Sequence, residues 1–217
     1  MSSVRAVLLD LWDTTAWGEM PPEDERLTKQ LGVSEGMLYD AFELTRDARG
    51  TGEYDSPEED LASVAQACGL ALAPDDVRRI TDFHISWLRR GVHLYDDTLP
   101  VLRELRDQGM RRAIISNCDH FTRPAVEALG LEDEVDAVVL SFEVGALKPN
   151  PAIYRVALER ILADASETIF VDDQTGYCDG AEALGIRAFR IDREGSDDLD
   201  PNGHTHIRDL RQLLELI

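Results

Sequence analysis

Short apolar runs rich in β-branched residues alternate along the chain with longer segments in which apolar residues recur every three or four positions. The first pattern is typical of buried strands and the second of amphipathic helices. The predicted strands are Val4–Leu9, Ala113–Ile115, Ala137–Leu140, Thr168–Val171 and Ala188–Ile191. The helices predicted around them are Thr98–Gln108, Thr122–Leu129, Pro151–Leu162, Tyr177–Leu184 and Ile207–Leu216. This alternation predicts an α/β fold, with a parallel sheet and helices on both of its faces.

The first two predicted strands are separated by about 100 residues, far more than an ordinary crossover connection needs. The pattern in between is helical, with predicted helices at Asp24–Leu31, Met37–Ala48, Pro57–Cys68 and Pro74–Arg90. We therefore predict a small helical bundle inserted after the first strand. The expected division is a main α/β domain of residues 1–16 and 92–217 and a helical domain of residues 17–91, joined by the linkers Trp17–Pro22 and Gly91–Asp97.

Polar side chains follow four of the predicted strands. The clusters are Asp10 to Thr15, Ser116 with Asn117, Lys148 with Pro149, and Asp172 with Asp173. In a parallel sheet the carboxyl ends of the strands meet at one edge, where ligands bind. We therefore expect these four clusters to lie close together.

The residue types in the clusters favour magnesium and phosphate chemistry. Asp10 and Asp173, with a backbone carbonyl between them, offer the hard oxygen ligands that Mg²⁺ prefers. Asp10 could attack phosphorus covalently, and the Lys148 ammonium could neutralise charge on the nucleophile and on a transferring phosphoryl group. Lysine is also scarce, because only Lys29 and Lys148 among the 22 basic residues are lysines, and this scarcity singles out Lys148.

The order and spacing of the four clusters resemble the haloacid dehalogenase superfamily of hydrolases over essentially the whole chain. The resemblance is closest in Val144–Tyr154 and in Phe170–Gly185. It implies a modified Rossmann core with an all-helical cap inserted between the first and second motifs. It also implies Asp10 as nucleophile, Ser116 as a donor to a phosphate oxygen, Lys148 as a charge clamp and Asp173 as a metal ligand. Because the pair Asp172 and Asp173 is present, we expect Mg²⁺ as cofactor and a small phosphorylated metabolite as substrate.

The resemblance also implies a set of metal ligands: Asp10, the backbone carbonyl of Trp12, and Asp173, with Asp172 available to fill the coordination shell. The candidate substrate-binding residues are Asn117, Trp12, Arg46 and Arg49. The two arginines precede a glycine-rich turn in the predicted cap and could reach an anionic substrate, or could simply complement a helix C-terminus. Trp12 could form a wall for the substrate or pack at the boundary between core and cap.

Two positions depart from the superfamily pattern. Trp12 stands where the phosphatases carry a second Asp that protonates the leaving group and then activates water. An indole cannot transfer protons in this way, so a step typically worth ~10²- to 10⁴-fold loses its usual agent. Asp13 could replace that catalytic Asp only if the loop turns its side chain inward. Tyr177 stands where the superfamily usually has Asp or Asn beside the metal.

These departures leave three functional hypotheses open. The first is a Mg²⁺-dependent phosphatase, which the pair Asp172 and Asp173 favours. The second is a hydrolase of carbon–halogen or related bonds that forms an ester on Asp10 without metal, although that branch of the superfamily lacks the acidic pair. The third is a noncatalytic binding or regulatory protein that has kept the shape of the site.

Composition narrows the class of partner. The 217 residues include 43 acidic and 22 basic side chains, a net charge of −21, which excludes a basic nucleic-acid binder. The three cysteines, Cys68, Cys118 and Cys178, are widely spaced and indicate the reduced thiols of a cytoplasmic protein. Because Asp10 interrupts the first apolar run, we expect neither a signal peptide nor a membrane span. The sequence indicates no oligomeric state.

Overall fold

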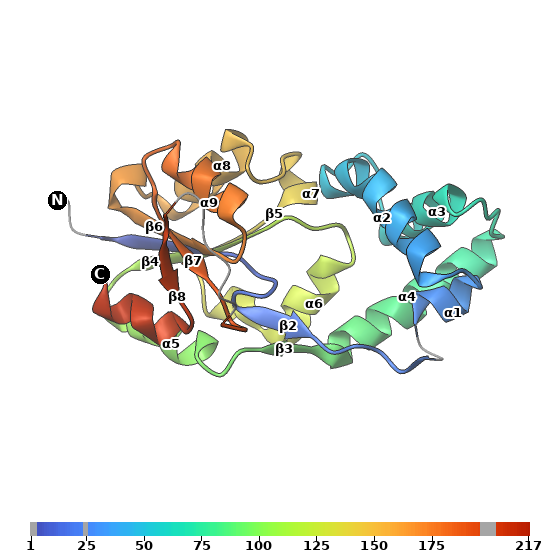
Figure 1. Cartoon of the computed structure of the whole chain (residues 1–217), viewed down its shortest axis with the longest axis horizontal. Helices are drawn as coiled ribbons and strands as arrows, with labels where there is room; N and C mark the ends of the chain where they lie inside the picture. Colours follow the sequence, from blue (N-terminus) through green and yellow to red (C-terminus); the bar gives the residue numbers. More distant parts are fainter. Residues whose placement is uncertain (1–3, 24–25, 196–202) are drawn as a thin grey trace.

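The computed structural model describes residues 4–23, 26–195 and 203–217. Its centre is a six-stranded sheet in the order β5-β4-β1-β6-β7-β8, in which every neighbouring pair runs parallel. The strands are β1 (Ala6–Leu9), β4 (Arg111–Ser116), β5 (Ala137–Leu140), β6 (Thr168–Asp172), β7 (Arg187–Ile191) and β8 (Thr205–Ile207). The α/β fold with a parallel, Rossmann-like sheet is confirmed (Figure 1).

The sheet is apolar on both faces because helices cover both. Along β1, Val7 and Leu9 belong to one buried cluster, and Ala6 and Leu8 belong to another on the opposite face. Side chains alternate between the faces of a strand, so a strand covered on both sides must be apolar at every position. This requirement explains the uninterrupted apolar runs in the sequence.

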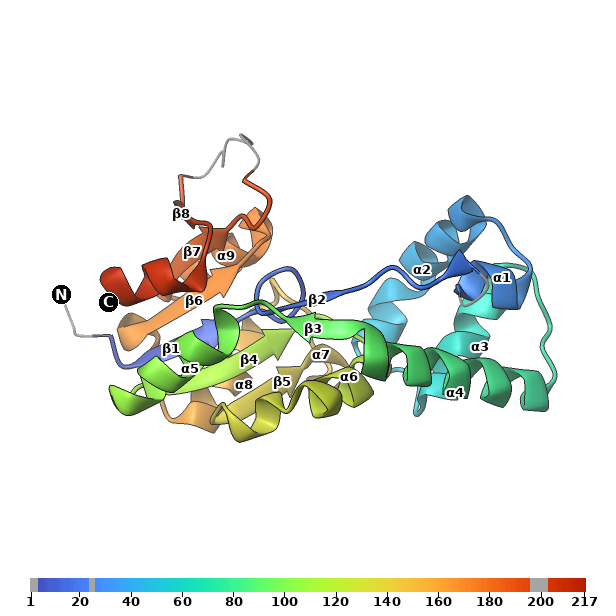
Figure 2. The same ribbon diagram turned by 90° about the horizontal axis from the view of Figure 1, so that it is seen from below.

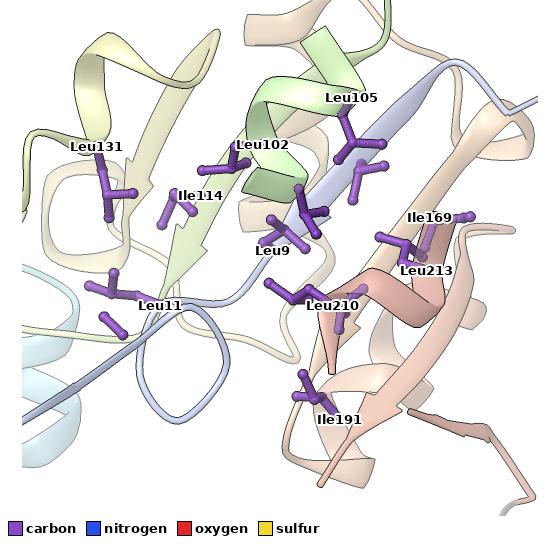
Figure 3. Close-up of a cluster of buried hydrophobic side chains, with 14 of the residues drawn as sticks. Leu9, Leu11, Leu102, Leu105, Ile114, Leu131, Ile169, Ile191, Leu210 and Leu213 are labelled. Atoms are coloured by element: carbon purple, nitrogen blue, oxygen red, sulfur yellow. The ribbon is translucent and has the colours of Figure 1, made fainter. Parts of the chain in front are cut away.

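Different helices complete the two clusters. The first cluster lies beneath helix α5 and the 3₁₀ helix η4, whose leucines point toward the sheet (Figure 3). The second lies beneath α8 and α9, on the other side of the sheet (Figure 1). The elements around the sheet are α5 (Thr98–Asp107), α6 (Thr122–Leu129), η2 (Leu131–Asp133), α7 (Ser141–Val144), α8 (Pro151–Ile161), η3 (Ala165–Glu167), α9 (Thr175–Glu182) and η4 (Leu210–Glu215).

Four helices stand apart from the sheet: α1 (Leu27–Leu31), α2 (Glu35–Gly50), α3 (Pro57–Ala67) and α4 (Pro74–Gly91). The antiparallel strands β2 (Ala16–Gly18) and β3 (Val92–Leu94) lead into and out of them (Figure 2). We call α1–α4 the helical insertion. It has its own buried cluster, which Phe121 joins from the sheet side. The domain division at residues 16/17 and 91/92 stays a prediction. None of the helices within the described ranges is long and apolar enough to cross a bilayer.

The helix predicted over Ile207–Leu216 is wrong. Ile207 ends β8, which adds to the sheet beside β7, and the following turn is the 3₁₀ helix η4. A capping box of Asp209 and Gln212 starts this helix, and its leucines pack on the sheet, so the same spacing of apolar residues serves a 3₁₀ helix. The two predicted linkers also contain the short strands β2 and β3. The predicted first helix of the insertion begins at Leu27, and residues 24–25 lie outside the described part of the chain.

Candidate active site

Asp10 lies immediately after β1, buried at the carboxyl edge of the sheet. Its backbone N–H donates to the Val171 carbonyl at 2.9 Å, and the Thr15 hydroxyl donates to the Asp10 carbonyl at 2.9 Å. The Thr15 and Ala16 N–H groups both donate to the Leu11 carbonyl, which closes the loop after β1 into a tight turn. The Asp10 backbone is therefore fixed by the neighbouring strand and by its own loop.

Lys148 is buried at the sheet edge, in the segment between α7 and α8. Its Nζ lies 2.5 Å from Asp10 Oδ1 and 2.6 Å from Asp172 Oδ2. Burial opposes the charge on Lys148, but Asp10 and Asp172 together raise its pKa above the usual value. The Tyr177 ring faces Nζ at 4.9 Å. The ammonium thus bridges two carboxylates from different strands and stays charged at neutral pH.

Asp10, Asp172 and Asp173 form an acidic cluster in which one ligand oxygen from each lies within 4.8 Å of the other two. Burial, with a contribution from Asp172, raises the pKa of Asp10 to about 8, although Lys148 acts in the opposite direction. Burial and Asp172, and to a smaller extent Asp13, raise the pKa of Asp173 to about 7. The Lys148 ammonium pairs with only two of these three carboxylates, Asp10 and Asp172, so the fully ionised cluster carries more negative charge than Lys148 balances. Its oxygen donors and its charge fit Mg²⁺.

Ser116 and Asn117 lie at the end of β4, beside β1. The Ser116 hydroxyl is buried and has no hydrogen-bond partner among the described residues. A buried hydroxyl normally has a partner, so this one is suited to a ligand. The Asn117 amide hydrogen-bonds to the backbone of Lys148. The substrate contacts assigned to the two residues stay predictions.

Trp12 and Asp13 take different positions in the loop after β1. Trp12 is half-buried, packs against the core cluster under α5, and lines a cavity beside the site. Asp13 is exposed and has a left-handed backbone with φ of 56°. Partial burial and Glu194 raise its pKa, and its charge acts in turn on Asp173. Its carboxylate is therefore within electrostatic range of the acidic cluster without being enclosed in it.

The two candidate arginines of α2 face the sheet edge. Arg49 is buried and forms an ion pair with Asp119, and it also donates to the Thr45 hydroxyl and the Phe42 carbonyl. Arg46 is exposed and donates to the Tyr177 hydroxyl at 3.0 Å. Both line a cavity of about 310 Å³ between the insertion and the sheet edge, together with Trp12, Phe42, Glu43, Gly50, Asn117, Cys118, Asp119, Thr122 and Leu147. The cavity presents both signs of charge beside an aromatic wall.

Further contacts that the sequence analysis missed hold the insertion against the sheet edge. Asp60 of α3 is fully buried, and its Oδ2 accepts from the His120 N–H at 3.1 Å and lies 2.9 Å from His120 Nδ1. Burial and the neighbouring Asp119 raise the pKa of Asp60. Asp119 and His120 closely follow Ser116 and Asn117 in the loop after β4. Their position after a strand could have identified them in the sequence as candidate site residues.

A family model described as haloacid dehalogenase-like hydrolase matches residues 4–185. Among curated proteins, a phosphatase of Mycobacterium tuberculosis is 32% identical over 103 residues, covering 46% of this chain and 48% of that protein. An (S)-2-haloacid dehalogenase of a Pseudomonas species is 32% identical over 159 residues, covering 73% of this chain and 63% of that protein.

A solved structure of a HAD phosphatase from Thermococcus onnurineus superposes with a TM-score of 0.70 at 24% identity, over 98% of this chain and 97% of that one. This likeness shows the fold. The matched stretches span about half the length of the first curated relatives. The relatives include both a phosphatase and a dehalogenase, so the comparisons identify neither the substrate nor the metal dependence of this chain.

Proposed function

The chain belongs to the haloacid dehalogenase-like hydrolases, and we propose that it is a Mg²⁺-dependent phosphatase of small phosphorylated metabolites with Asp10 as nucleophile. The observation that carries the proposal is the acidic cluster, in which three carboxylates converge while the Lys148 ammonium pairs with two of them, Asp10 and Asp172. Attack on carbon without metal needs no site for a divalent cation, so it does not by itself explain three carboxylates around one ammonium. A divalent cation would offset the excess negative charge of the cluster and would allow a phosphate anion to bind beside Asp10.

Each residue has a specific task in this reaction. When bound by the acidic cluster and the Trp12 carbonyl, Mg²⁺ would keep Asp10 ionised and balance the charge of the phosphate. Lys148 would offset negative charge on Asp10 and on the phosphoryl oxygens, and the Ser116 hydroxyl would donate to one of those oxygens. The residues of the cavity, with Trp12 and Arg46 at its walls, would contact the rest of the substrate.

Phosphoryl transfer would proceed in two displacements. A carboxylate oxygen of Asp10 bonds to phosphorus while the bond from phosphorus to the leaving oxygen breaks, and the leaving group keeps the electron pair. Water then attacks the phosphorus of the aspartyl phosphate and loses a proton, inorganic phosphate departs, and the Asp10 carboxylate is restored. Asp13 is the acidic side chain closest in sequence to the missing acid, and we propose it as the acceptor of that proton.

Replacing Trp12 by Asp should show how far the missing acid limits the rate of phosphate hydrolysis. The variant Trp12→Asp should hydrolyse an alkyl phosphate about 10²-fold faster than the native protein, because an alkoxide needs a proton as it leaves. An aryl phosphate, whose leaving group needs no proton, should gain much less. The measurement is kcat/KM for both substrates, with Trp17→Asp in β2 as the matched substitution outside the cavity. Equal gains on both substrates would count against this role for position 12.

The proposed function predicts a metal requirement that a dehalogenase would not share. The native protein should release phosphate from para-nitrophenyl phosphate with Mg²⁺ and lose that activity in EDTA, and it should leave (S)-2-chloropropionate intact. Mg²⁺ at about 100 times its Kd should also add about 2.7 kcal/mol to the free energy of unfolding, and Asp173→Asn should remove most of this gain. Halide release that persists in EDTA would overturn the proposal in favour of carbon–halogen hydrolysis. Mg²⁺ binding without any turnover would indicate a binding protein.

A further inference from the structure

The side chain of Asn117 hydrogen-bonds to both main-chain groups of one residue. Its Nδ2 donates to the Lys148 carbonyl at 2.9 Å, and its Oδ1 accepts from the Lys148 N–H at 2.6 Å. The amide group of Asn117 thus pairs with the Lys148 backbone as a neighbouring strand would. The two residues are 31 positions apart in the sequence.

This pairing matters because Lys148 lies in no helix or strand. The segment between α7 and α8 turns back on itself, with the Ala146 N–H donating to Ser141 and the Asn150 N–H donating to Leu147. Asn117, by contrast, directly follows β4, whose register against β1 is set by the sheet. Asn117 therefore ties a segment without regular structure to the sheet edge that carries Asp10.

A second contact restricts the same segment from the side of α9. A Cβ atom at Gly180 would lie 2.7 Å from Pro149 Cβ, so Pro149 packs directly on the α9 backbone. The Lys148–Pro149 step is held between Asn117 on one side and Gly180 on the other. Whether Lys148 Nζ can contact Asp10 and Asp172 then depends on the position of the Lys148–Pro149 backbone.

We propose that Asn117 is a positioning residue for Lys148, and that its amide sets the place of Nζ between the two carboxylates. This role is separate from the substrate contact predicted from the sequence, which stays a prediction, because the bonds to Lys148 use one of the two amide N–H groups and one lone pair of the amide oxygen. The consequence for turnover rests on the proposed function of Lys148, whereas the placement of Nζ does not. A displacement of about 1 Å at such a group can cost about 10²-fold in rate.

The scarcity of lysine provides a readout that is independent of activity. Protein labelled with ¹⁵N at the lysine Nζ should give signals from Lys29 and Lys148 alone. In Asn117→Ala the Lys148 signal should shift and its ammonium protons should exchange faster with water, while the exposed Lys29 serves as the internal reference. Asn117→Ser should change the signal in the same direction by a smaller amount, and it provides a second variant if Asn117→Ala folds poorly.

Kinetics of the same variants separate positioning from substrate binding. For para-nitrophenyl phosphate, Asn117→Ala should lower kcat about 10- to 100-fold with KM changed less than about 3-fold. Asn150→Ala is the matched control, because Asn150 lies in the same segment but caps α8 through the Ala152 N–H. A raised KM with an unmoved Lys148 signal would overturn the proposal. If the native protein hydrolyses no phosphate, the Lys148 signal alone still decides the role of Asn117.

Discussion

The variant Asp10→Asn should lose at least about 10³-fold of the phosphatase activity, because an amide oxygen cannot take the place of a carboxylate nucleophile. The fold should survive, since Asn has the shape of Asp and the N–H and carbonyl of residue 10 keep their bonds to Val171 and Thr15. Removing the charge also relieves repulsion in the acidic cluster, where burial raises the pKa of Asp10 to about 8. The metal-free variant should therefore unfold at a temperature no lower than that of the native protein.

Two measurements test this expectation directly. Steady-state hydrolysis of para-nitrophenyl phosphate gives the loss of kcat, and mass spectrometry of acid-quenched protein should find a phosphoryl group on Asp10 in the native protein only. Asp107→Asn is the matched control, because Asp107 ends α5 at the opposite edge of the sheet and is exposed. Full activity in Asp10→Asn would remove Asp10 as the nucleophile, whatever the metal requirement.

The predictable parts of the fold are the elements in which buried side chains recur at the regular period of a strand or a helix. Strand β5 and helix α6 have the predicted bounds, because continuous apolar runs and three-four spacing report directly on which faces are covered. The meeting of Asp10 with Asp172 and Asp173 follows from the same logic. β1 lies between β4 and β6, so residues at their carboxyl ends must meet.

The parts that were not predictable depend on pairings between distant irregular segments. Arg49 and Asp119 are 70 residues apart, and neither position differs locally from an ordinary surface charge. The amide of Asn117 hydrogen-bonds to the backbone of Lys148. Every residue except proline has these backbone groups, so the sequence does not indicate which residue is the partner. The α-helix predicted over the last residues failed for a related reason, because a short row of leucines on the sheet fits a 3₁₀ helix as well as an α-helix.

Replacing Lys148 by Met should both inactivate and destabilise the protein. The substitution preserves much of the buried side-chain volume but leaves Asp172, which is fully buried, and Asp10 without their counter-charge. Breaking a buried ion pair by removing one partner costs about 3–5 kcal/mol. The expected result in EDTA is a loss of this size in the free energy of unfolding, measured by urea denaturation, with no detectable phosphate release when Mg²⁺ is restored.

The loss of folding stability in Lys148→Met should be larger at high pH than at low pH. Burial already raises the pKa of Asp10 to about 8 in the folded metal-free protein, against 3.8 for an ordinary Asp, so the folded state binds this proton more tightly than the unfolded state. Stability from such a group falls as pH rises from about 4 to about 8, and removing Lys148 extends the fall to higher pH because it takes away the charge that lowers this pKa. Lys148→Met should thus recover stability as pH is lowered from 8 toward 5, by more than the native protein does.

Two further variants serve as controls for this prediction. The double variant Lys148→Met with Asp172→Asn should recover part of the stability lost at pH 8. Lys29→Met, which removes the exposed lysine, should be as stable as the native protein at every pH. A Lys148→Met protein as stable as the native one at pH 8 would mean that the acidic cluster is balanced by something other than Lys148.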